Sequence, residues 1–298
     1  MELVIHRPRP PLDAHVESMT FFAGLNPPYP REKLIPDGAI ELIVDLTATA
    51  KKLYHSETGP AATDFRQAWI SGMQRRPIII EAQPGASLFV IRFCPGGAHV
   101  FLGHPADVLT DGVFGLGDVV GQAATSLRDR ILEAGSSARR FAAAETWLLE
   151  RAGGRLIVNR TVQFLAARLG QGRVRDLVDA TGFSERHVQA LFRRFVGVTP
   201  KQFARIARFK AMLRSLGGIE NMELRGDPLP EQDWAGIATA HGFADQSHLS
   251  HEFRGFTGIT PSAYLARYRG LDNYLPIAVP APSAEFGFLQ DGGSRVGP

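Results

Sequence analysis

The side chains of this 298-residue chain that could do the most specific chemistry are hydrogen-bond donors following two glycine turns, at Gly182 and Gly242. An arginine can donate two hydrogen bonds to guanine N7 and O6, and a glutamine can bond adenine N6 and N7. We predict that six of these side chains face base edges of double-stranded DNA: Arg186, Gln189, Gln246, Ser247, Ser250 and His251. Three arginines nearer the helix ends suit phosphate positioning: Arg193, Arg194 and Arg254.

The pattern around each glycine predicts a helix-turn-helix, which places its second helix in the major groove. In the first copy, an apolar stripe of helical period runs from Val174 to Thr181. Gly182 can adopt the positive φ of a helix C-terminus, and Ser184 can cap the next helix through its hydroxyl. The second copy repeats this order with Gly242 and the cap residue Asp245.

The two copies form an internal repeat. The segment from Phe192 to Pro200 matches the segment from Phe253 to Pro261 at a constant offset of 61 residues. Between the two turn glycines the offset is 60, so the second copy has one extra residue in its turn. A repeat of this length indicates one structural unit used twice. The matched caps, aromatic residues and exit Gly-x-Thr-Pro make a pair of ordinary helical hairpins the weaker interpretation.

A specific signature lies in the second copy. It reads Gly242-Phe243-Ala244-Asp245-Gln246-Ser247-His248-Leu249-Ser250-His251-Glu252-Phe253-Arg254, followed by Gly258-Ile259-Thr260-Pro261-Ser262-Ala263-Tyr264. With this tract, the segment from about Asn159 to Arg269 resembles the DNA-binding domain of the AraC/XylS family of bacterial transcription regulators. The resemblance implies seven helices in two subdomains, a long bridging helix at about 200–216, and recognition helices that enter successive major-groove segments on one DNA face. The chain departs from the family at Gly217 to Asp233, where the link is longer and richer in glycine.

Positive charge is concentrated in the same part of the chain. The net charge is only +3, but residues 155–270 have 17 Lys/Arg against 10 Asp/Glu, and the remainder has 16 against 20. Residues 173–216, the first unit with the bridging helix, have 10 basic and 3 acidic residues, whereas residues 233–269, the second unit, have 3 of each. Because Lys and Arg supply the phosphate attraction that dominates DNA affinity, we expect the first unit to provide most affinity and the second to adjust specificity. A solvated basic helix face is the alternative interpretation.

The first 120 residues follow a strand pattern. Apolar residues alternate at period two from Ile40 to Leu46, and apolar runs on both sides of Pro84-Gly85 predict a hairpin. A helix is predicted near Leu12 to Phe22. Between Val119 and Arg151 the apolar period is helical again, which predicts two helices that link the domains, pair with a second copy or pack in the interior.

Together these patterns predict an α+β chain, with an N-terminal β-rich sensor-like domain and flanking helices. A C-terminal all-α domain follows, made of two helix-turn-helix subdomains joined by a long helix. The expected boundaries are 1–120 for the β-rich sensor or dimerisation domain, 121–155 for a helical linker or dimerisation helices, 156–270 for the DNA-binding domain and 271–298 for a flexible tail. The tail is expected to be flexible because it is rich in proline and glycine from Tyr274 onward and has little to bury.

The tract from Ile35 to Ile43 is similar to a recurring front domain of such regulators, which names no ligand. We expect a sequence-specific transcription regulator that responds to a small-molecule effector through this domain. Two alternatives stay open: a constitutive regulator whose front domain only forms a homodimer, and an enzyme or repair module fused to a DNA-binding domain. An alkylation-repair fusion would need a Pro-Cys-His-Arg setting, whereas Cys94 precedes Pro95-Gly96-Gly97, so we predict no catalytic residues.

Metal sites, cofactors and membrane segments are not expected. Two histidine groups have poor ligand geometry, or are better explained by capping and DNA contact: His99 with His104, and His241 with His248 and His251. The single cysteine excludes an intramolecular disulfide. With neither a signal-peptide pattern nor a run of about 18 apolar residues, the sequence predicts a cytoplasmic protein. Its expected partners are promoter DNA and, for an activator, RNA polymerase.

Overall fold

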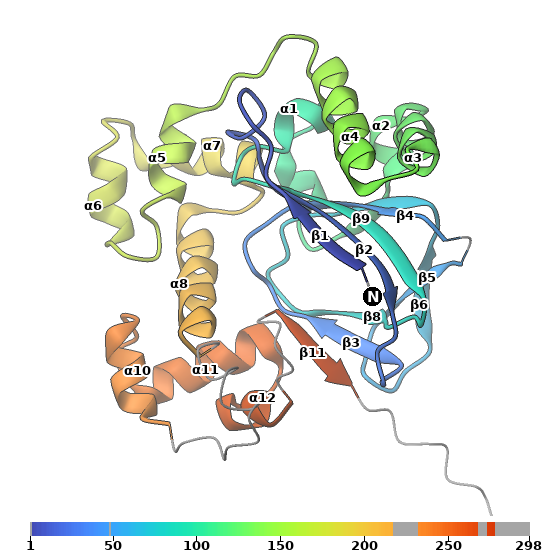
Figure 1. The fold of residues 1–298 in the computed structure, drawn as a ribbon. Helices are drawn as coiled ribbons and strands as arrows, with labels where there is room; N and C mark the ends of the chain where they lie inside the picture. The colour runs from blue at the N-terminus through green and yellow to red at the C-terminus, as the bar shows by residue number, and fades with distance from the viewer. Residues whose placement is uncertain (1, 48, 217–231, 268–272, 278–298) are drawn as a thin grey trace, which may run out of the picture.

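Two antiparallel β-sheets face each other in the first part of the chain (Figure 1), in a computed structural model that describes residues 2–47, 49–216, 232–267 and 273–277. Sheet A has the order β1 (Glu2–His6), β2 (Val16–Leu25), β9 (Ala86–Phe93), β4 (Glu41–Asp45), β7 (Ala68–Ser71), β10 (Val113–Gly115). Sheet B has the order β11 (Tyr274–Ile277), β3 (Arg31–Leu34), β8 (Ile78–Glu81), β5 (Lys51–Tyr54), β6 (Ala61–Phe65).

The alternation of side chains along each strand gives sheet A two different faces. On β4, Leu42 and Val44 are fully buried and lie opposite Ile91 and Phe89 of β9. These residues belong to the main hydrophobic core, whereas Ile43 points to the space between the sheets. The predicted strand from Ile40 to Leu46 is therefore confirmed.

Short helices cover the outer face of sheet A. They are α1 (His99–Leu102), the 3-10 helix η1 (Ala106–Leu109), α2 (Leu116–Val120), α3 (Ala123–Glu133) and α4 (Ser137–Ala152). Leu127, Ile131 and Trp147 of α3 and α4 are buried, and the ring of Phe141 lies 5.4 Å from that of Phe89. The two predicted helices between 119 and 151 are confirmed, and their apolar residues pack in the interior of this chain.

The C-terminal region is helical as far as residue 267, and Figure 1 shows it beside the two sheets. In its described residues the helices are α5 (Arg160–Ala166), α6 (Val174–Asp179), α7 (Glu185–Val196), α8 (Pro200–Leu216), α10 (Trp234–Ala240), α11 (Gln246–Thr257) and α12 (Pro261–Arg267). Helix α8 joins the two units, as the resemblance implies, and the α+β fold class is confirmed. The glycine-rich link at 217–231 lies outside the described residues.

The helix predicted near Leu12 to Phe22 is wrong, because strand β2 occupies most of this segment. A register shift between Val16 and Ser18 adds one residue to the strand where it pairs with β9. Val16 and Met19 are consequently buried on the same side although they are three residues apart, a spacing typical of a helix. The bulge therefore explains the error.

The hairpin predicted around Pro84-Gly85 is also wrong. Strands β8 and β9 flank this turn, but β8 pairs with β3 and β5, whereas β9 pairs with β2 and β4. The turn carries the chain from sheet B to sheet A. Both strands bury an apolar face in the same interior, which gives the same local pattern as a hairpin.

The expectation of a flexible tail from residue 271 is corrected at residues 274–277. These residues form β11, which pairs with β3 from Tyr274 opposite Leu34 to Ile277 opposite Arg31. Leu275 and Ile277 are 1% and 3% exposed, so this short segment does bury apolar surface. Residues 278–298 lie outside the described part of the chain.

No helix in the described ranges is both long enough and apolar enough to cross a membrane.

Candidate nucleic-acid interface and interior cavity

The second helix of each unit begins at the residue predicted to cap it. Ser184 Oγ accepts a hydrogen bond from the backbone N–H of His187 at 3.3 Å, and Asp245 Oδ1 accepts from the N–H of His248 at 2.7 Å. The turn glycines before these caps, Gly182 and Gly242, have φ of +72° and +70°, which is the left-handed region that glycine tolerates best.

Each recognition helix buries one apolar face against its own unit. In α7 the buried residues are Val188, Phe192 and Val196, and in α11 they include Leu249, Phe253 and Phe256. Leu191 and Phe195 are only half-buried. The ring of Phe195 instead lies edge-on to His99 of α1, with centroids 4.7 Å apart.

The opposite faces of α7 and α11 are open to solvent. Among the residues predicted to contact DNA, seven are exposed: Arg186, Arg193, Arg194, Gln246, Ser247, His251 and Arg254. Gln189 and Ser250 are half-buried. Gln189 Nε2 donates to Glu185 Oε1 at 3.0 Å, so one N–H of this amide is used within the helix.

Histidines near α11 have structural partners. His248 Nδ1 accepts from the backbone N–H of Ala244 at 3.1 Å, which closes the turn before the helix. His241 Nε2 lies 2.9 Å from Ser215 Oγ, and burial lowers the pKa of His241. Within the ranges that the structure describes, no three His, Cys, Asp or Glu side chains are grouped to hold a metal ion.

Some of the basic residues of the first unit and its bridging helix form ion pairs within the protein. Arg205 of α8 makes a bidentate ion pair with the buried carboxylate of Glu252 on α11, at 2.9 and 2.8 Å. Lys210 of α8 lies 4.0 Å from Asp37. Both cations join elements of the fold, whereas Arg186, Arg193 and Arg194 of α7 are exposed.

The C-terminus of α7 packs against η1 of the first domain. Thr110 Oγ1 donates to the carbonyl of Gly197 at 2.6 Å. A Cβ at Gly197, where φ is +98°, would lie 2.9 Å from Thr110 Oγ1 and 3.1 Å from the carbonyl oxygen of Ala106. Glycine is needed here both for the left-handed cap and for the close approach.

The C-terminus of α11 meets sheet B in the equivalent place of the repeat. Lys33 Nζ donates to the carbonyl of Thr257 at 3.0 Å and pairs with Glu57 at 2.6 Å. A cation at this end of a helix is favoured by the helix dipole. Arg267 of α12 also lies 3.7 Å from Glu57, and β11, the next described element after α12, belongs to sheet B.

A buried ion cluster lies where α8 crosses the turn at Asp37. Arg92 pairs with Asp37, with Glu41 at 2.6 Å and with Glu17 at 3.2 Å. Burial disfavours the charged guanidinium, but the three carboxylates outweigh it and raise the pKa of Arg92. Burial lowers the pKa of Lys210, which approaches the same cluster from α8. Glu41 also faces the space between the sheets, so the cluster joins that space to α8.

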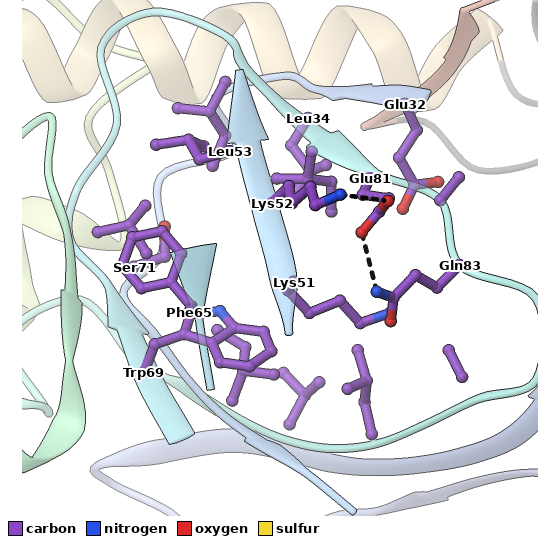
Figure 2. A pocket seen from close by; sticks show the side chains of 18 of the residues that line it. Glu32, Leu34, Lys51, Lys52, Leu53, Phe65, Trp69, Ser71, Glu81 and Gln83 are labelled. Atoms are coloured by element: carbon purple, nitrogen blue, oxygen red, sulfur yellow. Dashed lines mark hydrogen bonds and ion pairs between the residues drawn. The ribbon is translucent and has the colours of Figure 1, made fainter. Parts of the chain in front are cut away.

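The two sheets enclose a cavity of about 100 Å³, shown in Figure 2. By this measure a single water molecule needs roughly 10–15 Å³, so the cavity has room for a small organic molecule. Apolar side chains line most of it, including Phe22, Trp69 and Leu88 of sheet A and Ile80 of sheet B. Tyr274 of β11 lies in the wall, and burial raises the pKa of its hydroxyl.

The polar residues of this cavity were not predicted from the sequence. Lys51 is only 7% exposed, and Glu32 is half-buried on β3. Consecutive residues of a strand point to opposite faces, so the pair Lys51-Lys52 on β5 required one lysine to point inward. The two consecutive lysines were therefore the sequence signal that could have indicated a charged group in the interior.

Cys94 has the environment of an inert thiol. Burial raises its pKa to about 11, with Glu17 and Asp13 acting in the same direction. Its Sγ donates to the carbonyl of Asp13 at 3.7 Å. A thiol with so high a pKa is a poor nucleophile at neutral pH.

Comparison with known proteins agrees with this architecture. Residues 177–267 match a helix-turn-helix domain family, and residues 5–114 match a domain of unknown function, DUF6597. No curated protein sequence matches the chain.

Solved structures of ToxT from Vibrio cholerae are also similar to it. One structure of ToxT from strain O395 is 10% identical, with 85% of this chain and 98% of ToxT covered at a TM-score of 0.43. The wild-type form with a bound unsaturated fatty acid is 12% identical, with coverage of 85% and 96% at a TM-score of 0.42. Similarity at this level is too low to transfer a ligand or a residue role.

The helix-turn-helix match spans both units of the repeat, whose caps, buried faces and bridging helix have the arrangement expected of them. Residues 177–267 therefore belong to a helix-turn-helix domain family, as the resemblance of this segment to the DNA-binding domain of AraC/XylS regulators implies.

Proposed function

We propose that α7 and α11 read two segments of one DNA site. Base contacts come from Arg186, Gln189, Gln246, Ser247, Ser250 and His251, and phosphate contacts come from Arg193, Arg194 and Arg254. The observation that carries this proposal is the exposed, donor-rich face of each recognition helix. Helix α8 has 17 residues and spans about 25 Å. This length is of the same order as the roughly 34 Å between successive major-groove segments.

Selection of bound sequences from random DNA by the full chain tests this proposal. We expect a site with two preferred segments. Arg186→Ala should relax preference at one or two base pairs in one segment, by about 1–3 kcal/mol, and Gln246→Ala should do the same in the other. Uniform weakening over all sequences would instead make Arg186 a phosphate contact, and no enrichment of any sequence would contradict the proposal.

We further propose that a small molecule in the cavity between the sheets is the effector. Support comes from two connections between the cavity and the DNA-binding units. Tyr274 lies in the cavity wall and follows α12 by a few residues, and Glu41 joins the cavity to α8 through Arg92. A ligand that binds more tightly to one arrangement of these contacts shifts the population of that arrangement.

One alternative is a constitutive regulator whose first domain only forms a homodimer. DNA binding by the full chain, measured with and without small molecules that raise its melting temperature, separates the two. An effector changes DNA affinity, whereas a dimerising domain shows only a concentration dependence. The symmetry of the selected DNA site reports whether one or two copies bind.

A further inference from the structure

Two side chains of opposite charge face the cavity without pairing with each other. Lys51 on β5 and Glu32 on β3 both lie in its wall. No ion pair with a nitrogen–oxygen distance within 4.0 Å joins them, although each affects the pKa of the other. Figure 2 shows both side chains reaching into the same space, next to Glu81 and Gln83.

Neither charged group has a hydrogen-bond partner among the residues that the structure describes. The neighbouring polar groups are already paired with one another. Gln83 Nε2 donates to Glu81 at 2.8 Å and to the carbonyl of Ala50 at 2.5 Å, and Lys52 lies 3.8 Å from Glu81. Lys51 is only 7% exposed and faces the cavity, so its ammonium can take a hydrogen-bond acceptor from a ligand there.

Burial disfavours the charged form of both side chains, as expected of groups that lack a partner of opposite charge. It raises the pKa of Glu32 from its usual 4.5 to about 7, against the opposing effect of Lys51. It also lowers the pKa of Lys51, against the opposing effects of Asp45, Glu81 and Glu32. Each charge would gain from a ligand group of the opposite sign placed within hydrogen-bond distance.

The remainder of the cavity is apolar and partly aromatic. The rings of Phe65 and Trp69 lie 6.3 Å apart in its wall, with Phe22 and Leu88 nearby. Ligand sites commonly combine such a wall with a few convergent polar groups that set orientation. Here the polar groups are one cation and one carboxyl, so neither a simple acid nor a simple amine satisfies both.

We propose that the cavity binds a small zwitterion of the α-amino acid class with an apolar side chain. Its carboxylate accepts from Lys51 Nζ, its ammonium donates to Glu32, and its side chain lies against Trp69 and Phe65. This ligand class rests on the effector role proposed above for the same cavity.

The first test uses the full chain and four named probes: L-leucine, L-phenylalanine, 3-phenylpropanoate and 2-phenylethylamine. Calorimetry and thermal shift should show binding of at least one of the two amino acids. The acid and the amine each lack one charged group, so they should bind roughly ten- to hundredfold more weakly than phenylalanine. Binding of 3-phenylpropanoate as tightly as phenylalanine would overturn the zwitterion in favour of an anion site.

Substitutions assign each end of the ligand to its residue. Lys51→Met should weaken amino acid binding by tenfold or more while leaving 2-phenylethylamine unaffected, and Glu32→Gln should leave 3-phenylpropanoate unaffected. Both variants remove a charge that has no hydrogen-bond partner in the described chain, so they should fold. The matched control is Lys52→Met, whose side chain is 42% exposed and pairs with Glu81. Equal losses for Lys52→Met and Lys51→Met would contradict the assignment.

DNA selection with the same preparations separates this inference from the proposed function. Specific DNA binding without binding of any amino acid would refute the ligand class and leave the regulator intact. Amino acid binding that never alters DNA affinity would support the site and refute its effector role.

Discussion

The two helix-turn-helix units differ in how their equivalent glycines meet the first domain. At Gly197 the contact is neutral, a single hydroxyl of Thr110 that donates to the end of α7. At Gly258, which is 61 residues later, the buried ammonium of Lys33 donates to the end of α11. The second unit also leads into sheet B through β11, whereas the first, in the residues described, adds no strand to either sheet.

We interpret this difference as a division of roles between the two units. The first unit has the exposed arginines Arg193 and Arg194 and touches the helices outside sheet A. The second unit is balanced in charge and is attached to the sheet that forms one wall of the cavity. We therefore expect the first unit to hold DNA and the second to respond to events in the cavity.

Weaker packing of β11, which attaches the second unit to sheet B, should lower stability the most. Leu275→Ala truncates a side chain that is 1% exposed, so we expect the free energy of unfolding to fall by about 2–5 kcal/mol. Urea denaturation of the full chain measures it. Leu3→Ala, at a leucine that is 55% exposed, is the control and should change stability by less than about 0.5 kcal/mol. A small effect of Leu275→Ala would mean that β11 does not hold the second unit.

Titration of Glu32 should change the stability of the region around β11, because Glu32 lies opposite Pro276 of β11. The pKa of its carboxyl is 4.5 in its usual state and about 7 in the folded protein, so the native state keeps a proton that the unfolded state has released. This contribution to stability is complete below about pH 4.5 and is lost as the pH rises through about 7.

Glu32→Gln should therefore be more stable than the parent at about pH 8, by roughly 3 kcal/mol at most, and similar to it at about pH 4. Lys51, Tyr29 and Tyr274 face Glu32 and are present in both proteins, so the difference between the two curves reports Glu32 itself. Denaturation of both proteins across this pH range measures the difference, and parallel curves would contradict the high pKa.

The two helix-end contacts can be compared directly. Lys33→Met removes a charged hydrogen bond to α11 and should lower the free energy of unfolding by roughly 1.5–3 kcal/mol. Thr110→Val removes a neutral hydrogen bond to α7 and should cost about 1 kcal/mol. Urea denaturation of both variants beside the parent gives the two values. Equal costs would remove the distinction between the two attachments.

The smallest expected effect comes from removing the arginines proposed to contact DNA phosphates. Arg193→Gln with Arg194→Gln should lower affinity roughly tenfold and reduce the slope of log affinity against log salt by about 2. Arg254→Gln in the second unit should reduce the slope by about 1. Titrations at several salt concentrations give both slopes, and no change for the double variant would exclude these arginines from phosphate contact.

The C-terminal units were predictable because their information is local. A cap such as Ser184 or Asp245 acts on a backbone N–H three residues away, and Gly182 is needed for a single φ. Because the unit is repeated, the turn glycine and the cap residue each occur twice in the sequence. Exposure of Arg186 and Gln246 follows from the same helical period.

The first domain was less predictable because its strands pair with partners far away in the chain. The bulge near Glu17 gave β2 the spacing of a helix, and the turn at Pro84-Gly85 could not reveal that it changes sheets. The cavity was missed for the same reason. Lys51 and Glu32 become neighbours only when three strands are aligned, which no local pattern shows.

Strand β11 completes sheet B with residues that are synthesised long after the strand with which they pair. The backbone of β3 at Arg31–Leu34 lacks its outer partner until the ribosome has added residue 277, after both DNA-binding units. Until then β3 is an open sheet edge, which is a template for pairing with other chains. A fragment that ends at residue 155 would keep that edge permanently and would have a cavity without Tyr274.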